Sequence, residues 1–337
     1  MTAVMPVLRL RAEDAAAVAR AAELVIASDP TADPEAFARA ARGAIPALPA
    51  ALTTTLAAFR RHGSPSGAML VRGLPVGDLP PTPRDPRGLA GLRLPAGGCL
   101  GVIAAVLGDQ CGYAPELGGA IMQDIVPVPG HEDAQRSTSS TAALDIHTEL
   151  AFAPDGARAD HLALLCLRGD HDRAAGTTVS PARAVLARLP EPVTKVLREP
   201  RFRTSVDQSF LAGLGAGKPI WVGPIAVLSG PARRPCVRAD FAETQGTDAE
   251  AGQALARLRA AAEAAAVTVV LEPGDLLVIA NDRAWHGRTR FTPRWDVGDN
   301  RWLLRTSIMR DLARSAPYRP GGGRVIDIDY ATTGARQ

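Results

Sequence analysis

The sequence predicts a mainly β protein with flanking helices, organised as one domain over residues 1–337. Beyond residue 118, short apolar runs of β type are separated by Gly and Pro turns, which is typical of a sandwich or a barrel. Before that point the chain is rich in Ala, and its apolar residues recur about every 3.6 positions, which favours helices. With 46% hydrophobic and 22% charged residues, the chain can bury a sizeable core.

Residues 1–115 are expected to form a mostly helical N-terminal part. Pro34 marks the beginning of its second helical run, because proline is favoured in the first turn of a helix. We expect, in order, two or three helices within 12–27 and 34–61, a strand at 68–75, a Pro-rich loop and a buried helix at 99–109.

Residues 118–310 are expected to form the β core. The segment 248–265 has helical spacing and is predicted to be an insertion, and EPGD (272–275) is a good turn between two strands. The predicted strands lie within 120–128, 142–146, 161–167, 219–230, 267–272, 275–281 and 301–310.

Composition excludes several function classes. The 38 Lys and Arg nearly balance the 35 Asp and Glu and are scattered, so we expect no nucleic-acid partner. The longest apolar stretches fall far short of the roughly 20 residues of a membrane helix, so we expect no membrane span. The four cysteines show no CxxC spacing, and no signal-peptide pattern opens the chain. We therefore expect a cytoplasmic protein with reduced thiols.

His147 and Glu149 stand two positions apart in LDIHTELAF (144–152). In an extended chain such residues point to the same side, so both can reach one point in space, which suits a metal ion. A second histidine, His286, is expected to close the apolar strand that begins after the EPGD turn (272–275). Two His and one carboxylate favour a non-haem Fe(II) oxygenase, whereas zinc more usually recruits a third His or Cys. A purely structural role for these histidines is the alternative.

Two arginines follow in NRWLLRTSIMR (300–310). If this segment is a strand, Arg301, Leu303 and Arg305 share one face, and both guanidinium groups point inward. A planar Arg fork binds a carboxylate through two parallel hydrogen bonds, as a site for 2-oxoglutarate requires. The alternative is that both are exposed strand arginines.

These motifs resemble the clavaminate synthase-like branch of the Fe(II)/2-oxoglutarate-dependent oxygenases, which includes β-hydroxylases of free arginine and asparagine. The resemblance covers roughly residues 120–310. It implies a double-stranded β-helix core, a distorted jelly roll, and a reaction that uses Fe(II), 2-oxoglutarate and O2. The matching pieces are IMQDIVPVPG (121–130), STAALDIHTELAF (140–152), ADHLALLCLRGD with GTTV (159–179), and HGRTRFTPRWDVGDNRWLLR (286–305).

The resemblance also implies roles for individual residues. His147, Glu149 and His286 would ligate iron. The other implied contacts are Arg301 with the distal carboxylate of 2-oxoglutarate, Thr177 with 2-oxoglutarate, Arg305 with the α-carboxylate of an amino-acid substrate, Gln123 with its amino group, and Ser137 in the substrate pocket.

The chain departs from the family's pattern in two places. The link WDVGDNR (295–301) is one residue longer than usual, so Arg301 is assigned from its R-W-L-x-R context. Leu150 follows Glu149 at a position that is often polar in arginine hydroxylases. Both departures concern the identity of the substrate more than the type of reaction.

A lid with a helical insertion is expected around 205–265, where relatives close over the substrate. A basic substrate side chain would need an acidic partner, and VRADFAETQGTD (237–248) offers Asp240 and, as a second choice, Glu243. The alternative is that these acids lie at a solvated helix N-terminus, where the helix dipole favours them.

The implied function is hydroxylation of Cβ or Cγ of an L-amino acid, free arginine or another polar or basic amino acid, in natural-product biosynthesis such as that of antibiotics. The substrate could arrive free or tethered to a carrier. Desaturation or oxidative cyclisation by the same site is one alternative, and a non-catalytic jelly-roll binding protein is another. The oligomeric state is left open.

Overall fold

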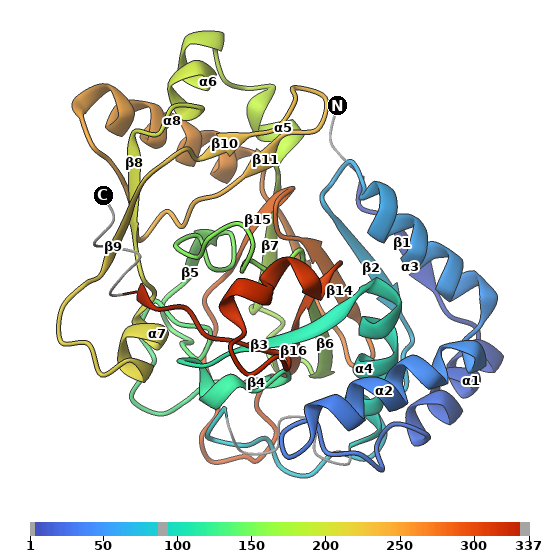
Figure 1. Ribbon diagram of the computed structural model, residues 1–337. Helices are drawn as coiled ribbons and strands as arrows, with labels where there is room; N and C mark the ends of the chain where they lie inside the picture. Colours follow the sequence, from blue (N-terminus) through green and yellow to red (C-terminus); the bar gives the residue numbers. More distant parts are fainter. Residues whose placement is uncertain (1–3, 87–93, 331–337) are drawn as a thin grey trace.

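The structure, a computed structural model, describes residues 4–86 and 94–330. Two β-sheets lie at its centre, and two groups of helices lie on opposite sides of them (Figure 1). A mainly β fold with flanking helices is therefore confirmed.

The N-terminal helices form at the predicted places. Asp33 caps α2, because its Oδ1 accepts a hydrogen bond from the amide of Ala36 at 2.8 Å. The helices are α1 (Ala12–Glu23), α2 (Pro34–Ala44), the 3-10 turn η1 (Ile45–Ala47), α3 (Ala50–His62) and α4 (Pro95–Leu107).

Helix α4 is apolar on all sides and packs between the other N-terminal helices and the large sheet. Its glycines permit this close packing. A Cβ on Gly98 would lie 2.4 Å from the carbonyl oxygen of Ala22, and a Cβ on Gly101 would lie 2.6 Å from the ring of Phe37. Larger side chains at either position would push α4 away from α1 and α2.

The large sheet has the strand order β1-β2-β14-β6-β16-β3-β17, and β4 also pairs with β16. Its strands are β1 (Val7–Arg9), β2 (Ala68–Arg72), β3 (Asp109–Tyr113), β4 (Gln123–Ile125), β6 (His161–Arg168), β14 (Leu276–Ala280), β16 (Trp302–Met309) and β17 (Val325–Ile326). Because β1, β2 and β3 join strands from the second half of the chain, the sheet crosses the predicted boundary near residue 115. The division into two parts stays a prediction.

The small sheet has the order β13-β7-β15-β5 and faces the large one. Its strands are β5 (Leu144–His147), β7 (Gly176–Pro181), β13 (Val267–Val270) and β15 (Ala284–Arg288). Two turns, η2 (Leu117–Gly119) and η3 (Leu312–Tyr318), are 3-10 helical.

The remaining elements lie on the side of the small sheet away from the N-terminal helices (Figure 1). Some of them also close one end of the cavity between the sheets. They are α5 (Ala182–Leu186), α6 (Glu191–Leu197), α7 (Gln208–Gly213) and α8 (Ala249–Ala265), the sheet of β8 (Phe202–Ser205), β9 (Trp221–Ile225) and β12 (Thr244–Gly246), and the pair β10 (Leu228–Ser229) and β11 (Cys236–Val237).

Side chains alternate between the layers, as the two-residue period of a strand requires. On β6, Ala163 and Leu165 pack against the N-terminal helices, whereas Leu162 and Leu164 face the small sheet. On β15, Trp285 packs among the residues of α8 and is fully buried. The adjacent His286 therefore points to the opposite face, toward the large sheet.

The prediction that His286 closes the strand after the EPGD turn is wrong. That strand, β14, ends at Ala280, and His286 lies on the separate strand β15 in the other sheet. The chain reverses at Asn281, whose buried amide group bonds to the backbone of Glu149 and to the carbonyl oxygen of Ala159. These long-range hydrogen bonds end the strand, and local hydropathy does not reveal them.

His161, at the start of β6, gives a pH-dependent contribution to stability. Burial lowers the pKa of its imidazole to about 4. Since the unfolded pKa is about 6.5, the contribution is complete above pH 6.5 and is lost as the pH falls toward 4, by up to roughly 3 kcal/mol. Urea unfolding of metal-free protein between pH 4.5 and 7 should show this decline, and His161→Phe should reduce its slope while His286, whose pKa is also lowered to about 4, keeps the remainder. An unchanged slope in the variant would contradict the assignment.

None of the helices within residues 4–86 and 94–330 combines the length and the apolar character of a membrane span.

Candidate functional site

A cavity of about 750 Å³ lies between the two sheets. Leu162, Leu164 and Leu303 line it from the large sheet, and Thr177 and His286 line it from the small one. Residues of α7 and of the segment between β11 and β12 close one end. The sequence-predicted site residues all line this cavity: Gln123, Ser137, His147, Glu149, Thr177, Asp240, Glu243, His286, Arg301 and Arg305.

His147, Glu149 and His286 converge in the cavity, and one ligand atom from each lies within 4.8 Å of the others. His286 Nε2 is 3.3 Å from Glu149 Oε1, and His147 Nε2 is 3.8 Å from the same oxygen. Two elements bring the histidines together, since β5 and β15 pair with His147 opposite His286. Within residues 4–86 and 94–330, no other group of His, Cys, Asp and Glu has metal-ligand spacing.

Glu149 follows β5 in a turn, and Asn281 holds it there. Asn281 Oδ1 accepts a hydrogen bond from the Glu149 amide at 2.7 Å, and Asn281 Nδ2 donates to the Glu149 carbonyl oxygen at 3.1 Å. The next residue, Leu150, has a positive φ of 56°. This unusual backbone, together with the Asn281 clamp, directs the carboxylate back toward the two histidines.

The three groups shift one another's protonation. Burial lowers the pKa of His286 to about 4, and the neighbouring His147 adds to this effect. Burial also lowers the pKa of His147, but the hydrogen bond and charge of Glu149 outweigh it and raise that pKa to about 9. For Glu149, Arg305 and the two histidines outweigh burial and lower the pKa. Glu149 is thus ionised and His286 neutral at pH 7, the forms that bind a metal ion.

The donor set fits Fe(II). His147 Nδ1 donates to the carbonyl oxygen of Asp145 at 2.8 Å, so Nε2 is the nitrogen that faces Glu149. With its raised pKa His147 is protonated at pH 7 in the metal-free protein, and a metal ion would bind Nε2 by displacing that proton. His286 also presents Nε2 to Glu149. Two imidazole nitrogens and one carboxylate oxygen on the same side form the 2-His-1-carboxylate set of non-haem iron sites.

Arg301 supplies an unmatched positive charge deeper in the cavity. The residue is only 6% exposed, and its guanidinium has no hydrogen bond or ion pair with the described residues. Burial lowers its pKa. On the neighbouring strands, Arg288 lies opposite Thr177, and burial together with Arg301 lowers the pKa of Arg288 to about 9. Two buried cations side by side favour an anionic ligand at this end.

Arg288 is hydrogen-bonded to the chain itself. Its Nη atoms donate to Ser139 Oγ and to the carbonyl oxygens of Ser140, Ala142 and Thr289. It therefore holds the loop that carries Ser137 over the cavity, and Arg301 is left as the free fork.

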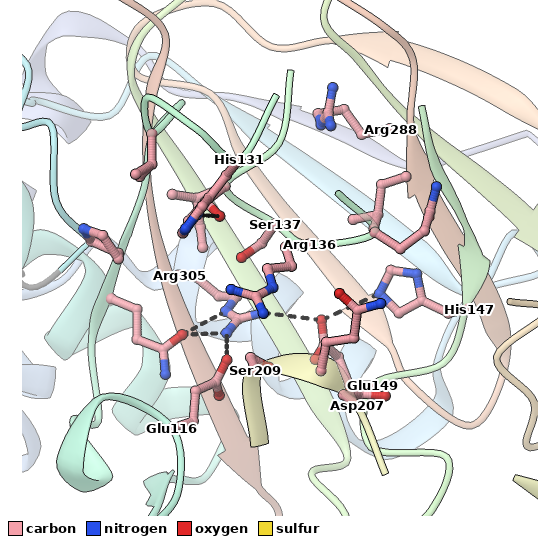
Figure 2. A pocket seen from close by; sticks show the side chains of 18 of the residues that line it. Glu116, His131, Arg136, Ser137, His147, Glu149, Asp207, Ser209, Arg288 and Arg305 are labelled. Carbon is pink, nitrogen blue, oxygen red and sulfur yellow. Dashed lines mark hydrogen bonds and ion pairs between the residues drawn. The ribbon is translucent and has the colours of Figure 1, made fainter. Parts of the chain in front are cut away.

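Arg305, in contrast, is surrounded by acceptors (Figure 2). Its Nε donates to Gln123 Oε1 at 3.0 Å, because β4 and β16 pair with Gln123 opposite Arg305. Its Nη2 lies 2.6 Å from Glu116 Oε1, and its Nη1 lies 3.4 Å from Glu149 Oε1. Gln123 thus orients Arg305, and Arg305 bridges the predicted metal ligands and Glu116.

Acidic side chains surround the outer part of the cavity. An isolated antiparallel β-bridge joins the backbones of Asp240 and His147, and burial raises the pKa of the Asp240 carboxyl group. Burial and the charge of Asp240 raise the pKa of Asp207, whose carboxylate has no hydrogen bond within the part of the chain described here. Glu243 is half-buried and its pKa is also raised by burial. Asp240 and Glu243 lie in a turn before β12, so the alternative of a helix N-terminus is wrong.

Glu116, Asp207 and Asn281 belong to the site but are not predicted by any pattern in the sequence. Glu116 stands in a Gly-rich turn after β3 and Asp207 stands before the short helix α7, and neither place has a recognisable motif. Arg136 is likewise not predicted, although it projects into the cavity beside Ser137 (Figure 2).

Asn281→Ala should weaken metal binding by roughly 10- to 100-fold, because a group that orients a ligand contributes about that much. The matched control is Asn300→Ala, since Asn300 makes the same pair of hydrogen bonds with the backbone of Arg294. Titration of Fe(II) under anaerobic conditions would measure both affinities. Equal affinities in the two variants would contradict the role of Asn281.

Comparison with known proteins identifies the family. Residues 50–307 match the family described as taurine catabolism dioxygenase TauD, TfdA family. The chain is 41% identical over 297 residues to an L-asparagine oxygenase of Streptomyces coelicolor, which covers 87% of this chain and 86% of the relative. It is 34% identical over 333 residues to an L-lysine 3-hydroxylase of Catenulispora acidiphila, with 97% and 90% covered.

A solved structure of asparagine oxygenase in complex with Fe(II), 2S,3S-3-hydroxyasparagine and succinate superimposes with a TM-score of 0.89 and 38% identity, covering 96% of this chain and 99% of that one. The chain therefore belongs to the TauD/TfdA dioxygenase family, and the resemblance to Fe(II)/2-oxoglutarate-dependent oxygenases that its motifs predict is confirmed.

Proposed function

We propose that this chain hydroxylates Cβ or Cγ of a free L-amino acid with a polar or basic side chain, using Fe(II), 2-oxoglutarate and O2. The observation that carries the proposal is the meeting of the His147, Glu149 and His286 cluster with unpaired Arg301 and with Arg305 in one cavity.

The finer architecture belongs to the same proposal. We take the two facing sheets as a double-stranded β-helix within a single oxygenase domain. In this view residues 1–115 form the N-terminal part, and residues 205–265 form a lid over the cavity. The position of α7 and of Asp240 at the end of the cavity supports the lid.

The proposed ligands divide the cavity between them. His147, Glu149 and His286 would hold Fe(II), and Arg301 would bind the distal carboxylate of 2-oxoglutarate with Thr177 beside it. Together these bound groups supply the oxidising chemistry that converts an unactivated C–H bond to an alcohol. The apolar walls at Leu162, Leu164 and Leu303 exclude water from the reacting carbon.

Arg305 and Glu116 are suited to the head group of an amino acid. They lie 2.6 Å apart and present opposite charges, so Arg305 can bind the α-carboxylate while Glu116 accepts hydrogen bonds from the α-ammonium. Gln123 orients Arg305 and stands near the same ammonium group. A substrate tethered to a carrier as a thioester would lack the free carboxylate, so we propose a free amino acid.

The acids at the outer end indicate the class of side chain. Asp207 and Asp240 are both buried, and the charge of Asp240 adds to burial in raising the pKa of Asp207. A substrate ammonium, guanidinium or amide group placed between them would donate hydrogen bonds and relieve this repulsion. Ser137 lines the same space and would contact the substrate. A head group held at Arg305 leaves Cβ or Cγ as the carbon nearest the metal ligands.

The test is mass spectrometry of reactions with Fe(II), 2-oxoglutarate and single L-amino acids: Arg, Lys, ornithine, Gln and Asn. The expected result is a product that gains one oxygen, with succinate formed in equal amount, and no product with His147→Ala. A product that has lost two hydrogens would show that the reaction is desaturation or cyclisation and not hydroxylation. Binding of metal and 2-oxoglutarate without any turnover across the panel would overturn the proposed substrate class.

Asp207→Asn tests the substrate class directly. If Asp207 faces a cationic side chain, the variant should lower kcat/KM for basic amino acids by roughly 30-fold or more, because a buried charge pair is worth about 2 kcal/mol or more. For asparagine the change should be several-fold at most. Asp172→Asn, which removes a surface charge paired with Arg294, serves as the control. If the ratio of kcat/KM for basic amino acids to kcat/KM for asparagine is the same in the variant and the wild type, Asp207 does not contact the substrate side chain.

A further inference from the structure

A second cavity, of about 430 Å³, lies outside the proposed active site and shares no lining residue with it. The segment after Glu149, strands β9 and β11 and the end of β16 contribute to its walls. Four arginines line it: Arg158, Arg238, Arg310 and Arg314.

Two of these arginines pair closely with a buried acid, and the other two share one exposed carboxylate at a longer distance. Arg310 and Arg314 both pair with Asp160, at 2.7 and 3.1 Å. Arg158 and Arg238 share one carboxylate, that of Asp155, whose Oδ1 lies 3.6 Å from the Nη1 atom of each. This distance is too long for a hydrogen bond.

Exposure weakens Asp155 further as a partner. Its side chain is 87% exposed, whereas the side chains of Arg158 and Arg238 are 11% and 15% exposed. Water screens a carboxylate in that position, so it offsets little of the cost of burying two guanidinium groups. The third acid of the cavity, Asp282, is paired with Arg283 at 3.3 Å, and its charge acts on Arg158 without an ion pair or hydrogen bond between the two side chains.

Hydrogen bonding leaves part of Arg158 free. Arg238 donates to the carbonyl oxygens of Ala151 and Ala153, which fixes its orientation. Arg158 reaches the carbonyl oxygen of Val237 only at 3.4 Å, and its buried Nε has no hydrogen-bond partner among the residues that the structure describes. Burial lowers the pKa of both guanidinium groups, that of Arg238 to about 10. The charge of Arg158 lowers the pKa of Arg238 further, whereas the charge of Asp155 raises the pKa of both.

We propose that this cavity is a binding site for a small dianion with carboxylate or phosphate oxygens, held between Arg158 and Arg238. Both Nη1 atoms lie 3.6 Å from a single oxygen of Asp155, so one anion of the size of phosphate or a short dicarboxylate can reach both guanidinium groups. The cavity has room for either ligand.

The site is connected to the lid and to the metal-ligand segment. Arg238 stands two residues before Asp240 and bonds to the backbone just after Glu149. An anion that neutralises Arg238 and Arg158 would strengthen the link between these two segments. Binding is therefore expected to raise the temperature of thermal unfolding.

The test is calorimetric titration of inorganic phosphate and of succinate, at constant ionic strength, into protein loaded anaerobically with Fe(II) and 2-oxoglutarate so that Arg301 is occupied. We expect saturable binding of at least one anion with one site per chain. Arg158→Gln should weaken it at least about tenfold, since a charged hydrogen bond is lost. Asp155→Asn, a change at an exposed position, should tighten it several-fold because a competing carboxylate is removed.

Arg257→Gln, which removes an exposed positive charge on α8, is the control and should leave the affinity unchanged. A higher affinity for succinate than for phosphate, or the reverse, would show whether the site takes a dicarboxylate or a phosphate group. Absence of saturable binding by both anions would overturn the proposal, as would equal affinities in the wild type, Arg158→Gln and Asp155→Asn. Because both variants lie outside the active-site cavity, this outcome is independent of the proposed hydroxylase activity.

Discussion

Replacing His286 with alanine is expected to lower turnover by at least about a thousandfold. A bound metal contributes several kcal/mol to a reaction, and about 4 kcal/mol corresponds to a thousandfold in rate. His286 offers one of only three donor atoms in the cluster, and within residues 4–86 and 94–330 no further His or Cys belongs to that cluster. The protein should remain folded, because the substitution leaves the paired backbone of β15 unchanged.

Three measurements together check this expectation: succinate formation with the preferred amino acid, Fe(II) affinity under anaerobic conditions, and circular dichroism to confirm folding. His62→Ala, at the end of α3 and away from the cavity, is the matched control. A His286→Ala variant that binds Fe(II) as tightly as the wild type would exclude this residue from the metal site. Loss of turnover with full metal affinity would assign it a role other than ligation.

Replacing Arg301 with glutamine is expected to raise the KM for 2-oxoglutarate by roughly 30-fold to a thousandfold. Loss of one partner of a buried charged hydrogen bond costs about 2 to 4 kcal/mol. The KM for the amino acid should change far less, because Arg305 and Glu116 lie at the head-group site. The free protein should lose little stability, since Arg301 is a buried cation with no hydrogen bond or ion pair to the described residues and only a cation–π contact with Phe291, 5.8 Å from Cζ to the ring centroid.

This combination of weaker cosubstrate binding and nearly unchanged stability separates a binding role from a structural one. Arg301→Lys keeps the charge but loses the fork, and should fall between the wild type and Arg301→Gln. Steady-state kinetics in 2-oxoglutarate and urea unfolding of the metal-free proteins provide the two readouts. An unchanged KM for 2-oxoglutarate, or a marked loss of stability, would refute the assignment.

Elements with strong local patterns were predictable from the sequence. The helical period in 12–27 and 248–265 corresponds to α1 and α8, and the apolar runs 161–167 and 275–281 correspond to β6 and β14. Short polar strands were not predictable in this way. Strand β8 has the sequence FRTS, and it exists because it pairs with β9 and β12 far along the chain.

The candidate site divides in the same manner. The pattern H-x-E and the alternation of Arg301, Leu303 and Arg305 are local, and the structure places all four of these polar and charged side chains in one cavity with Leu303. The site's supporting residues come from elsewhere. Glu116 and Asp207 line the cavity and Asn281 holds the backbone of Glu149, and the sequences around all three carry no distinct signal.

By itself, the sequence determined which residue types are available. It also determined which of them share a face of a strand, because side chains alternate between the two faces with a two-residue period. Only the tertiary structure decided that β5 and β15 pair with His147 opposite His286, that Asn281 turns the chain between the sheets, and that Arg305 is paired while Arg301 is free. The reason is physical. Strand pairing and the neutralisation of buried charge depend on groups that are distant in the chain, and they form only when the two sheets pack together.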